Sequence, residues 1–397
     1  MEERLAIFGG KPVRDAFLPY GRQYIDEDDI KAVVDTLRSD YVTCGPKIDE
    51  FENLVSEFVG AKYAVAVSSG TAALHAACFA AGIKAGDEVI TTPMTFAASA
   101  NCILYMGGKP VFADIETNTY NINPEEIERK ITSETKAIIP VDFTGQPVNL
   151  DAIKRIAEKN GLMVIEDAAH ALGAEYKGNK IGSISDMTIF SFHPVKHITT
   201  GEGGIITTDS AELFEKLRMF RTHGITRDSG KMIENDGAWY YEMLELGFNY
   251  RITDIQAALG ISQMKKIGKF LERRIEIAER YNKELSKLEE LVMPFQDINC
   301  RSAWHLYVLK LKLDRLKAGR KEVFDALRAE NIGVNVHYIP VYYHPYYKKL
   351  GYEKGLCPNA EKLYDEIITL PLHPSMNNTD ADDVIDAVRK VLEYYVK

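Results

Sequence analysis

Between residues 64 and 209, short apolar runs alternate with helix-like stretches, and this alternation constrains the fold more than any other feature of the chain. Strands that are apolar on both faces and separated by helices belong to a mainly parallel sheet covered on both sides. We therefore predict an α/β fold with seven buried strands, at Ala64–Val67, Glu88–Thr91, Pro110–Ala113, Ala137–Val141, Leu162–Ile165, Met187–Phe190 and Gly204–Thr207.

The length of 397 residues exceeds the size at which a single core stops growing, so a second domain is expected. We predict an N-terminal arm (1–20), a large domain (21–265) and a smaller α+β C-terminal domain (266–397). A capping box at Thr253 opens a helix that runs to about Ile267, and one long helix is expected to join the domains. The second domain is predicted from a charged helix, a strand-like segment, a helix and an aromatic loop, at Phe270–Leu288, Trp304–Leu313, Lys321–Glu330 and Val336–Tyr347.

Composition excludes several classes of function. The net charge of -10 disfavours nonspecific nucleic-acid binding. The five cysteines are odd in number and far apart, and no HExxH-like spacing occurs, so neither a disulfide framework nor a metal site is predicted. The chain has no run of about 18 apolar residues, and its first residues lack the order of a signal peptide, so we expect a cytoplasmic protein with no membrane partner.

A phosphate site is predicted directly after the first strand. Ser68-Ser69-Gly70-Thr71 opens the predicted helix Ala72–Ala81, and helix N-termini bind anions through free N–H groups and the helix dipole. An ordinary helix cap is the plainer interpretation. Neither GxGxxG nor GxxxxGK[ST] is present, so a phosphorylated cofactor smaller than a dinucleotide fits better.

Three more side chains follow strands of the same sheet, whose carboxyl ends form the ligand edge. Asp167 ends a buried strand and would need a cation such as a protonated pyridine nitrogen to stay ionised. Phe96 can stack on a planar ring, and Lys196 lies on a turn between two strands, where desolvation lowers the pKa of an amine. Alone, each has a plainer interpretation as a cap, a core ring or a surface lysine. Together with Ser191 they are the parts that pyridoxal 5′-phosphate requires.

These residues also resemble the DegT/DnrJ/EryC1/StrS family of sugar aminotransferases, which have the pyridoxal-phosphate-dependent transferase fold type I. The resemblance spans nearly the whole chain and rests on Ser69–Thr71, Thr92–Pro93 with Phe96, Ile165–His170, Ser191–His193 with Lys196, Glu202–Gly204, and Gly247–Arg251 with Thr253–Asp254. It implies that Lys196 bears the cofactor, Asp167 contacts the ring nitrogen and His170 lies near the ring hydroxyl. It further implies phosphate contacts from Gly70, Thr71 and Ser191.

The resemblance also implies that Asn249 reaches the phosphate of a neighbouring subunit, so that a homodimer shares its active sites. Dehydratases of the family carry histidine in place of the lysine. This chain keeps Lys196, which favours the aminotransferase interpretation.

Four local stretches resemble the C-4 aminotransferases of pseudaminic acid biosynthesis: Leu18–Tyr20, Asp40–Thr43, His193–Thr200 and Val336–Tyr342. This similarity implies that L-glutamate donates an amino group to C4 of a UDP-linked 4-keto-6-deoxy-N-acetylhexosamine, forming UDP-4-amino-4,6-dideoxy-N-acetyl-β-L-altrosamine. It places in the sugar-nucleotide pocket Tyr20, Tyr41, Thr43, Asn249, His337, Tyr338 and Pro340.

Three alternatives remain open from the sequence. Another C-4 aminotransferase, of the bacillosamine or perosamine type, would present similar motifs because substrate choice resides in variable loops. Sugar deoxygenation would call for an iron–sulfur centre or a missing lysine, and neither is visible. A regulator that binds the cofactor and a sugar nucleotide without turnover is the third. The sequence leaves the sugar epimer and the amino donor undecided.

Overall fold

The computed structural model describes residues 4–397 and contains the predicted seven-stranded sheet, in the order β1-β9-β8-β5-β4-β2-β3. The pairs from β8 to β3 are parallel, whereas β9 runs antiparallel to both β8 and β1. The strands are β1 (Tyr63–Val67), β2 (Glu88–Thr91), β3 (Lys109–Phe112), β4 (Thr135–Ile139), β5 (Met163–Asp167), β8 (Met187–Ser191) and β9 (Gly204–Thr208). The predicted α/β class is confirmed, while the first three residues of the predicted arm lie outside the described residues.

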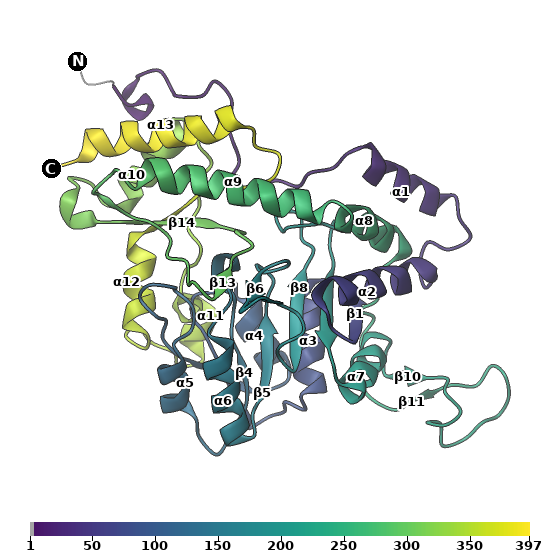
Figure 1. Cartoon of the computed structure of the whole chain (residues 1–397). Coiled ribbons are helices and arrows are strands. Elements are labelled where there is room, and N and C mark those ends of the chain that lie inside the picture. Colours follow the sequence, from purple (N-terminus) through teal and green to yellow (C-terminus); the bar gives the residue numbers. More distant parts are fainter. Residues whose placement is uncertain (1–3) are drawn as a thin grey trace.

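Helices cover both faces of this sheet (Figure 1). Successive strand residues point to opposite faces, so Val65 packs against one helical layer and Ala64 against the other. The first layer comprises α3 (Gly70–Ala80), α4 (Ala98–Tyr105) and α7 (Ala211–Arg221). The second comprises α2 (Pro46–Val59), α5 (Pro124–Lys130), α6 (Leu150–Asn160) and α8 (Asp254–Met264), and α1 (Glu27–Leu37) packs on α8.

A second core lies beyond the sheet. Its three strands are β12 (Leu291–Val292), β14 (Tyr307–Leu311) and β15 (Ile367–Leu370), and its helices are α9 (Ile267–Leu285), α10 (Arg320–Ala329) and α13 (Asn378–Tyr395). Leu5 and Leu18 from the start of the chain are buried in it. A further apolar cluster joins the two regions, because Met94 and Phe143 of the first pack with Leu306 and Tyr342 of the second. The division into three domains stays a prediction.

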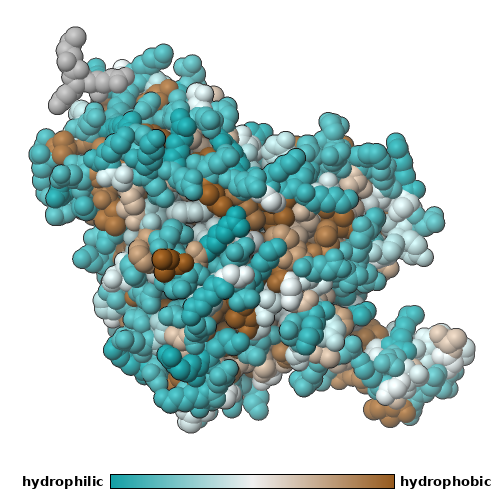
Figure 2. Space-filling view, viewed as in Figure 1, coloured by the Kyte–Doolittle hydropathy of each residue, from teal (hydrophilic) through white to brown (hydrophobic). Residues whose placement is uncertain are grey.

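Short elements complete the chain. Strands β6 (Glu175–Tyr176), β7 (Asn179–Lys180) and β13 (Cys300–Arg301) form a small sheet, and α11 (Pro345–Lys349) and α12 (Pro358–Glu366) precede β15. The pair β10 (Ile225–Thr226) and β11 (Glu242–Met243) carries a loop that projects from the body (Figure 1). Large side chains on this projecting hairpin and just after it are exposed, among them Ile233 at 87%, Trp239 at 73% and Leu246 at 75%. Figure 2 shows brown, hydrophobic residues on the surface of this projection.

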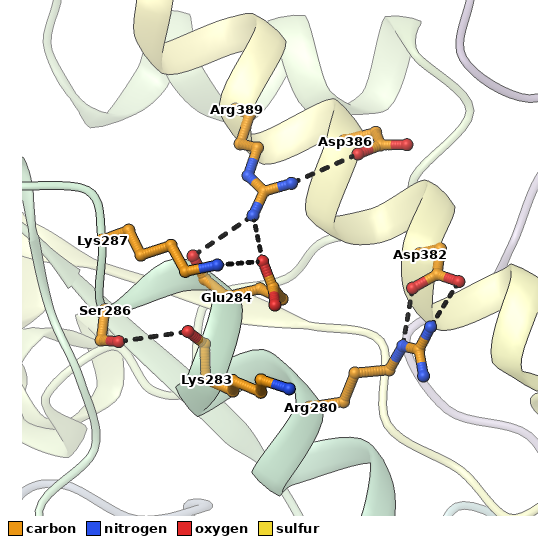
Figure 3. A network of polar contacts seen from close by, with 8 residues as sticks. All are labelled: Arg280, Lys283, Glu284, Ser286, Lys287, Asp382, Asp386 and Arg389. Atoms are coloured by element: carbon orange, nitrogen blue, oxygen red, sulfur yellow. Dashed lines mark hydrogen bonds and ion pairs between the residues drawn. The ribbon is translucent and has the colours of Figure 1, made fainter.

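Charged side chains line the outer edge of the contact between α9 and α13 (Figure 3). The Arg280 guanidinium donates from Nε and Nη2 to the two oxygens of Asp382, each at 2.6 Å. Glu284 accepts from Arg389 at 2.5 Å and from Lys287 at 2.7 Å. We call this group the α9–α13 seam.

Three predicted elements differ from the structure. The helix predicted from Thr253 to about Ile267 ends at Met264, so no single long helix joins the two regions, and Lys266 at the break binds Asp26 and Asp29 at 2.6 and 2.7 Å. The strand expected from Trp304 begins only at Tyr307, because Trp304 adopts a positive φ of 47°, which no strand accommodates. The aromatic loop contains the first residues of α11, which Pro345 starts.

Candidate active site

The predicted site residues lie at one edge of the large sheet. β1, β2, β5 and β8 end there, followed by Ser68, Thr92, Ala168 and Phe192 respectively. β9 is antiparallel, so it begins at this same edge with Gly204. The loop from β8 to β9 therefore leaves and re-enters the sheet at the edge where parallel sheets bind ligands, and this loop carries Lys196.

Hydrogen bonds within the β8–β9 loop fix the position of Lys196. Its N–H donates to His193 O at 2.9 Å, and the Thr200 N–H closes the loop on Phe192 O at 3.1 Å. The side chain is half-buried and its Nζ lies 3.4 Å from His305 Nε2. Burial, aided by the charge of Arg274 and opposed by that of Asp167, lowers the pKa of Lys196 to about 8. The amine is thus poised to lose and regain a proton near neutral pH.

Asp167 occupies the end of β5 and is 5% exposed. Its Oδ2 accepts from Ser99 Oγ at 2.6 Å and its Oδ1 from the Ala169 N–H at 3.2 Å. Burial raises the pKa of Asp167, and these two bonds and the charge of Lys196 oppose the rise. Both hydrogen-bond donors are uncharged, so the carboxylate still lacks the adjacent cation that a buried charge requires. The neighbouring Glu166 faces the other side of the sheet, toward Ser185 and Thr188.

The predicted phosphate site has the expected geometry. Ser69 caps α3 by accepting from the Ala72 N–H at 3.1 Å, which leaves the first helical N–H groups of Gly70 and Thr71 at the ligand edge. A Cβ on Gly70 would come within 3.0 Å of the Ser191 Cβ and 3.1 Å of its Oγ, so only glycine lets the Ser191 hydroxyl approach the helix start this closely. The three residues predicted as phosphate contacts are therefore brought together.

Aromatic and imidazole side chains form the side of the site nearest the second core. Tyr338 and His170 are linked at 3.1 Å between the hydroxyl and Nε2. The His337 ring packs on Tyr338 and lies 5.2 Å from the ring of Tyr20. Phe96 is 64% exposed and its ring lies 6.4 Å from that of Tyr338. This arrangement joins four predicted substrate or cofactor residues, Tyr20, His337, Tyr338 and Phe96, to the predicted catalytic His170.

Other predicted substrate residues lie apart within this subunit. Tyr41 and Thr43 are exposed in the segment between α1 and α2, and Thr43 bridges to Thr253. Asn249 is exposed on the strand-like segment that follows the projecting hairpin and bridges to Thr222. Pro340 is buried, and it lies beside Val341, whose N–H donates to Pro93 O at 3.1 Å. No hydrogen bond within residues 4–397 joins Tyr41, Thr43 or Asn249 to Lys196 or Asp167.

Three residues that the sequence did not single out complete the site. Ser99 on α4 holds Asp167, His305 touches Lys196, and Arg274 on α9 binds the backbone that carries His305. A histidine in an apolar segment and one arginine among the many charges of the predicted helix Phe270–Leu288 were the signals in the sequence, and such residues are commonly structural. Their role depends on the positive φ of Trp304, which turns His305 out of the predicted strand and toward the sheet edge.

The site fits the predicted cofactor, pyridoxal 5′-phosphate, on three independent features. Asp167 lacks a cation that a protonated ring nitrogen supplies, the α3 start with Ser191 offers donors for a phosphate, and Lys196 has an amine activated by burial. His170 is buried, and its Nδ1 has no hydrogen-bond partner among residues 4–397. When bound, the cofactor would supply an aldehyde and an electron-withdrawing ring, and Lys196 would be placed to move a proton at the reacting carbon.

The chain was compared with known families and proteins. The sequence model described as the DegT/DnrJ/EryC1/StrS aminotransferase family matches residues 23–389. An uncharacterized protein of Methanocaldococcus jannaschii is 51% identical over 381 residues, which cover 96% of this chain and 99% of the relative. The spore coat polysaccharide biosynthesis protein SpsC of Bacillus subtilis is 47% identical, with 96% and 98% covered. The UDP-4-amino-4,6-dideoxy-N-acetyl-beta-L-altrosamine transaminase of Campylobacter jejuni (strain 81-176) is 41% identical, with 95% and 98% covered.

Solved structures show the same overall similarity. PseC of Helicobacter pylori, an aminotransferase involved in pseudaminic acid biosynthesis, superposes with a TM-score of 0.89 at 32% identity, covering 96% of this chain and 100% of PseC. Spr1654 of Streptococcus pneumoniae, assigned as a sugar aminotransferase, superposes in its pyridoxal-phosphate form with a TM-score of 0.88 at 32% identity, covering 95% and 99%. The same protein is known in a pyridoxamine-phosphate form, with a TM-score of 0.89.

Proposed function

Because this chain belongs to the DegT/DnrJ/EryC1/StrS aminotransferase family, we propose that it transfers an amino group from L-glutamate to C4 of a UDP-linked 4-keto-6-deoxy-N-acetylhexosamine. Family membership confirms the predicted aminotransferase activity and the predicted cofactor, pyridoxal 5′-phosphate. The proposed product is UDP-4-amino-4,6-dideoxy-N-acetyl-β-L-altrosamine. The single observation that favours this substrate is the 41% identity over 95% of the chain to the Campylobacter jejuni transaminase of that name.

Each half of the reaction needs one residue to remove a proton from one atom and return it to another. We assign this role to Lys196, whose pKa of about 8 allows both steps at physiological pH. Asp167, buried at the end of β5, keeps the ring nitrogen of the cofactor protonated. The pKa of His170 lies well below its usual range because the side chain is buried, so we assign a neutral imidazole that hydrogen-bonds the ring hydroxyl.

The sugar pocket is proposed on the side of the site that holds Tyr20, His337 and Tyr338. Their rings lie in contact with one another and adjoin His170, and His337 is held by Thr369 Oγ1 at 2.9 Å. Aromatic faces cover the apolar faces of sugars, while hydroxyl and imidazole groups bind sugar hydroxyls. Pro340 shapes the same segment. Tyr41 and Thr43 remain proposed contacts of the nucleotide.

A homodimer is proposed from the projecting hairpin, whose exposed apolar side chains Ile233, Trp239 and Leu246 require a partner surface. A second copy of this chain is the proposed partner, because Asn249 follows the hairpin directly and is exposed, as a residue must be if it is to reach a neighbouring active site. The proposed active site thus combines Lys196 of one protomer with Asn249 of its partner.

The substrate assignment is tested by incubating the cofactor-loaded protein with L-glutamate and each of two epimeric UDP-4-keto sugars, the β-L-arabino and α-D-xylo forms. We expect 2-oxoglutarate and a 4-amino sugar from the L-arabino epimer, with the C4 configuration read by NMR. The Lys196→Ala variant is the matched control and should give neither product. Turnover of only the D-xylo epimer, or of a GDP-linked sugar, would assign a bacillosamine or perosamine type instead, and an unchanged visible spectrum with glutamate would indicate a regulator.

The shared site is tested by mixing two inactive variants, Lys196→Ala and Asn249→Ala, under conditions that exchange subunits. In a mixed dimer one site carries both substitutions and the other carries neither, so the mixture should recover about one quarter of wild-type activity. Recovery of no activity, with mixed dimers verified by mass spectrometry, would place Asn249 in its own protomer's site.

A further inference from the structure

Four imidazoles gather around the amine of Lys196. Three are buried in contact with one another, because the ring of His305 lies 4.3 Å from that of His170 and 5.6 Å from that of His197. His337 lies on the far side of Tyr338. Among residues 4–397, no group of three or more histidine, cysteine or acidic side chains has the geometry to hold a metal ion. His305 is the one whose nitrogen lies near the lysine, with 3.4 Å between Nε2 and Nζ.

The segment that carries His305 is tied to both regions of the molecule. The Ala303 N–H donates to Gly145 O at 2.9 Å, and Ala303 O lies 3.0 Å from His197 Nε2. The turn fits closely against Gly145, since a Cβ there would come within 2.9 Å of Trp304 N and 3.0 Å of His305 N. Gly145 itself has a φ of +105°, which favours glycine. Such a tight and strained turn indicates that the position of His305 is strongly specified.

Arg274 on α9 binds the turn at Trp304 and His305. The side chain is 0% exposed, and its Nη1 donates to Trp304 O at 3.3 Å, His305 O at 3.2 Å and Leu372 O at 2.8 Å. Its Nε and Nη2 have no hydrogen-bond partner within residues 4–397. A buried guanidinium without a carboxylate is costly to bury, and its three bonds to carbonyls hold the turn that carries His305. Its positive charge also opposes protonation of the nearby imidazoles and of Lys196.

We propose that His305 is a positioning residue that holds the ε-amino group of Lys196 whenever this group is not bonded to the cofactor, by accepting a hydrogen bond at Nε2, and that Arg274 fixes His305 there. During amino transfer the lysine is released and must stay beside the reacting carbon until it is needed again. A neutral imidazole is the appropriate acceptor, because it stabilises the ammonium without adding a second charge.

The charges that face this pair are consistent with a neutral acceptor. The pKa of His305 lies well below its usual range because of burial, and the nearby charge of Lys196 lowers it further. Ionisable groups from several elements face Lys196 or His305. Asp167 and His170 lie at and just after the end of β5, His197 follows β8, Arg274 lies on α9, and His337 precedes η4 (Val341–Tyr343). Only Asp167 among them is an anion, and its two oxygens accept hydrogen bonds from Ser99 Oγ and the Ala169 N–H.

The test uses the full-length chain freed of cofactor and follows the rate at which added pyridoxal 5′-phosphate bonds to Lys196, by absorbance, across pH. In this step the neutral amine adds to the aldehyde carbon and one water leaves, so the midpoint of the pH profile reports the pKa of the lysine amine. Because the readout needs no sugar or glutamate, its outcome is independent of the proposed substrate.

Removing the acceptor should destabilise the ammonium. We expect His305→Leu to lower the midpoint from about 8 by about one unit, whereas His305→Gln, whose amide oxygen accepts at a similar reach, should restore it. Arg274→Lys should give a smaller downward shift, because it keeps the charge but displaces the donor that Nη1 supplies to the turn. His75→Gln changes a buried imidazole within the Phe220–Phe248–Tyr250 aromatic cluster and should leave the midpoint unmoved.

An unchanged midpoint in His305→Leu would overturn the proposal, and so would an upward shift, which would mean that His305 donates to the neutral amine. If His305→Leu fails to fold, His305→Asn replaces it as a polar variant too short to reach Nζ, with the same expected direction. A midpoint lowered equally in His305→Gln and His305→Leu would also contradict the assigned hydrogen bond, because it would trace the effect to packing.

Discussion

Two arginines on the same helix show how differently one side chain is used. Arg280 lies on the α9–α13 seam, where its side chain is 40% exposed and both oxygens of Asp382 bind it. Arg274, less than two turns earlier, is fully buried; among residues 4–397 it binds only backbone carbonyls, and two of its nitrogens have no hydrogen-bond partner. Burial lowers the pKa of Arg274 to about 10, whereas the carboxylate of Asp382 raises the pKa of Arg280.

The contrast extends to the lysines and aspartates of the two regions. On the seam Arg280, Lys287 and Arg389 each have a carboxylate beside them (Figure 3), and water screens these pairs. Around Lys196 the charges are desolvated and incompletely paired, a state that costs stability and persists where a ligand completes it. The seam pairs are therefore complete without a ligand, whereas the incomplete pairing of Asp167 at the sheet edge is suited to a bound cofactor. The predictions below test this division.

The largest effect is expected from Lys196→Ala. This variant removes the group that bonds the cofactor and moves the proton, so the rate of amino transfer should fall by more than about 1,000-fold. The seam variant Lys287→Ala, which removes an exposed partner of Glu284, should keep wild-type turnover. Single-turnover kinetics with glutamate would measure both variants, with thermal unfolding as the check on folding. Activity above a few per cent in Lys196→Ala would reject the assignment.

The next effect concerns stability. Arg274→Leu removes a buried charge but leaves three buried carbonyls without their hydrogen-bond donor. We therefore expect the free energy of unfolding to fall by about 3 kcal/mol. Arg280→Leu removes an exposed pair and should cost about 0.5 kcal/mol at most. Urea unfolding of both variants measures the difference. Equal losses would show that the buried arginine is no more important to the fold than the seam.

Much of the fold could be predicted because its signals are local. Each strand of the large sheet is a short apolar run bounded by helix starts, and the capping boxes and the β8–β9 loop with its lysine are contiguous in the sequence. The same holds for Asp167, since a carboxylate at the end of a buried strand is conspicuous wherever it occurs. Lys196, Asp167, Gly70 and Ser191 converge because parallel strands end at one edge, a rule that needs no coordinates.

What could not be predicted depends on long-range packing. His305 comes from a segment that looks like the start of a strand, and only the turn at Trp304, held by Gly145 and Arg274, directs it to Lys196. Ser99 lies in a small-residue helix and gains its role from proximity to Asp167. The break at Lys266 likewise depends on Asp26 and Asp29, more than 230 positions away in the chain. Local sequence patterns do not indicate contacts between residues that are so far apart in the chain.

Asp167→Asn should sharpen the comparison between paired and unpaired carboxylates. An amide at this position cannot keep the ring nitrogen of the cofactor protonated, so we expect amino transfer to slow by at least about 100-fold with the cofactor still attached to Lys196. Asp382→Asn on the seam should leave the rate unchanged. The absorbance spectrum establishes cofactor content, and stopped-flow with glutamate gives the rate. A normal rate in Asp167→Asn would mean that another group protonates the ring.

The smallest expected effect is a pH dependence of stability in the cofactor-free protein. The folded-state pKa of Lys196 is about 8, below the ordinary lysine value of 10.5, so between these values the unfolded chain binds more protons than the folded one. Stability linked to this residue must then rise with pH from about 8 to about 10.5, because the unfavourable buried ammonium is lost. Since Lys196 is half-buried, we expect about 1 kcal/mol.

The measurement compares wild type with Lys196→Met, because other groups titrate in the same range and cancel in the difference. The difference in unfolding free energy should move in favour of the wild type by that amount as the pH rises through this window. A variant of the seam, Lys287→Met, serves as the matched control, because it removes an exposed lysine beside Glu284. A flat difference for Lys196→Met would mean that the amine is solvated in the free protein, and that only the cofactor activates it.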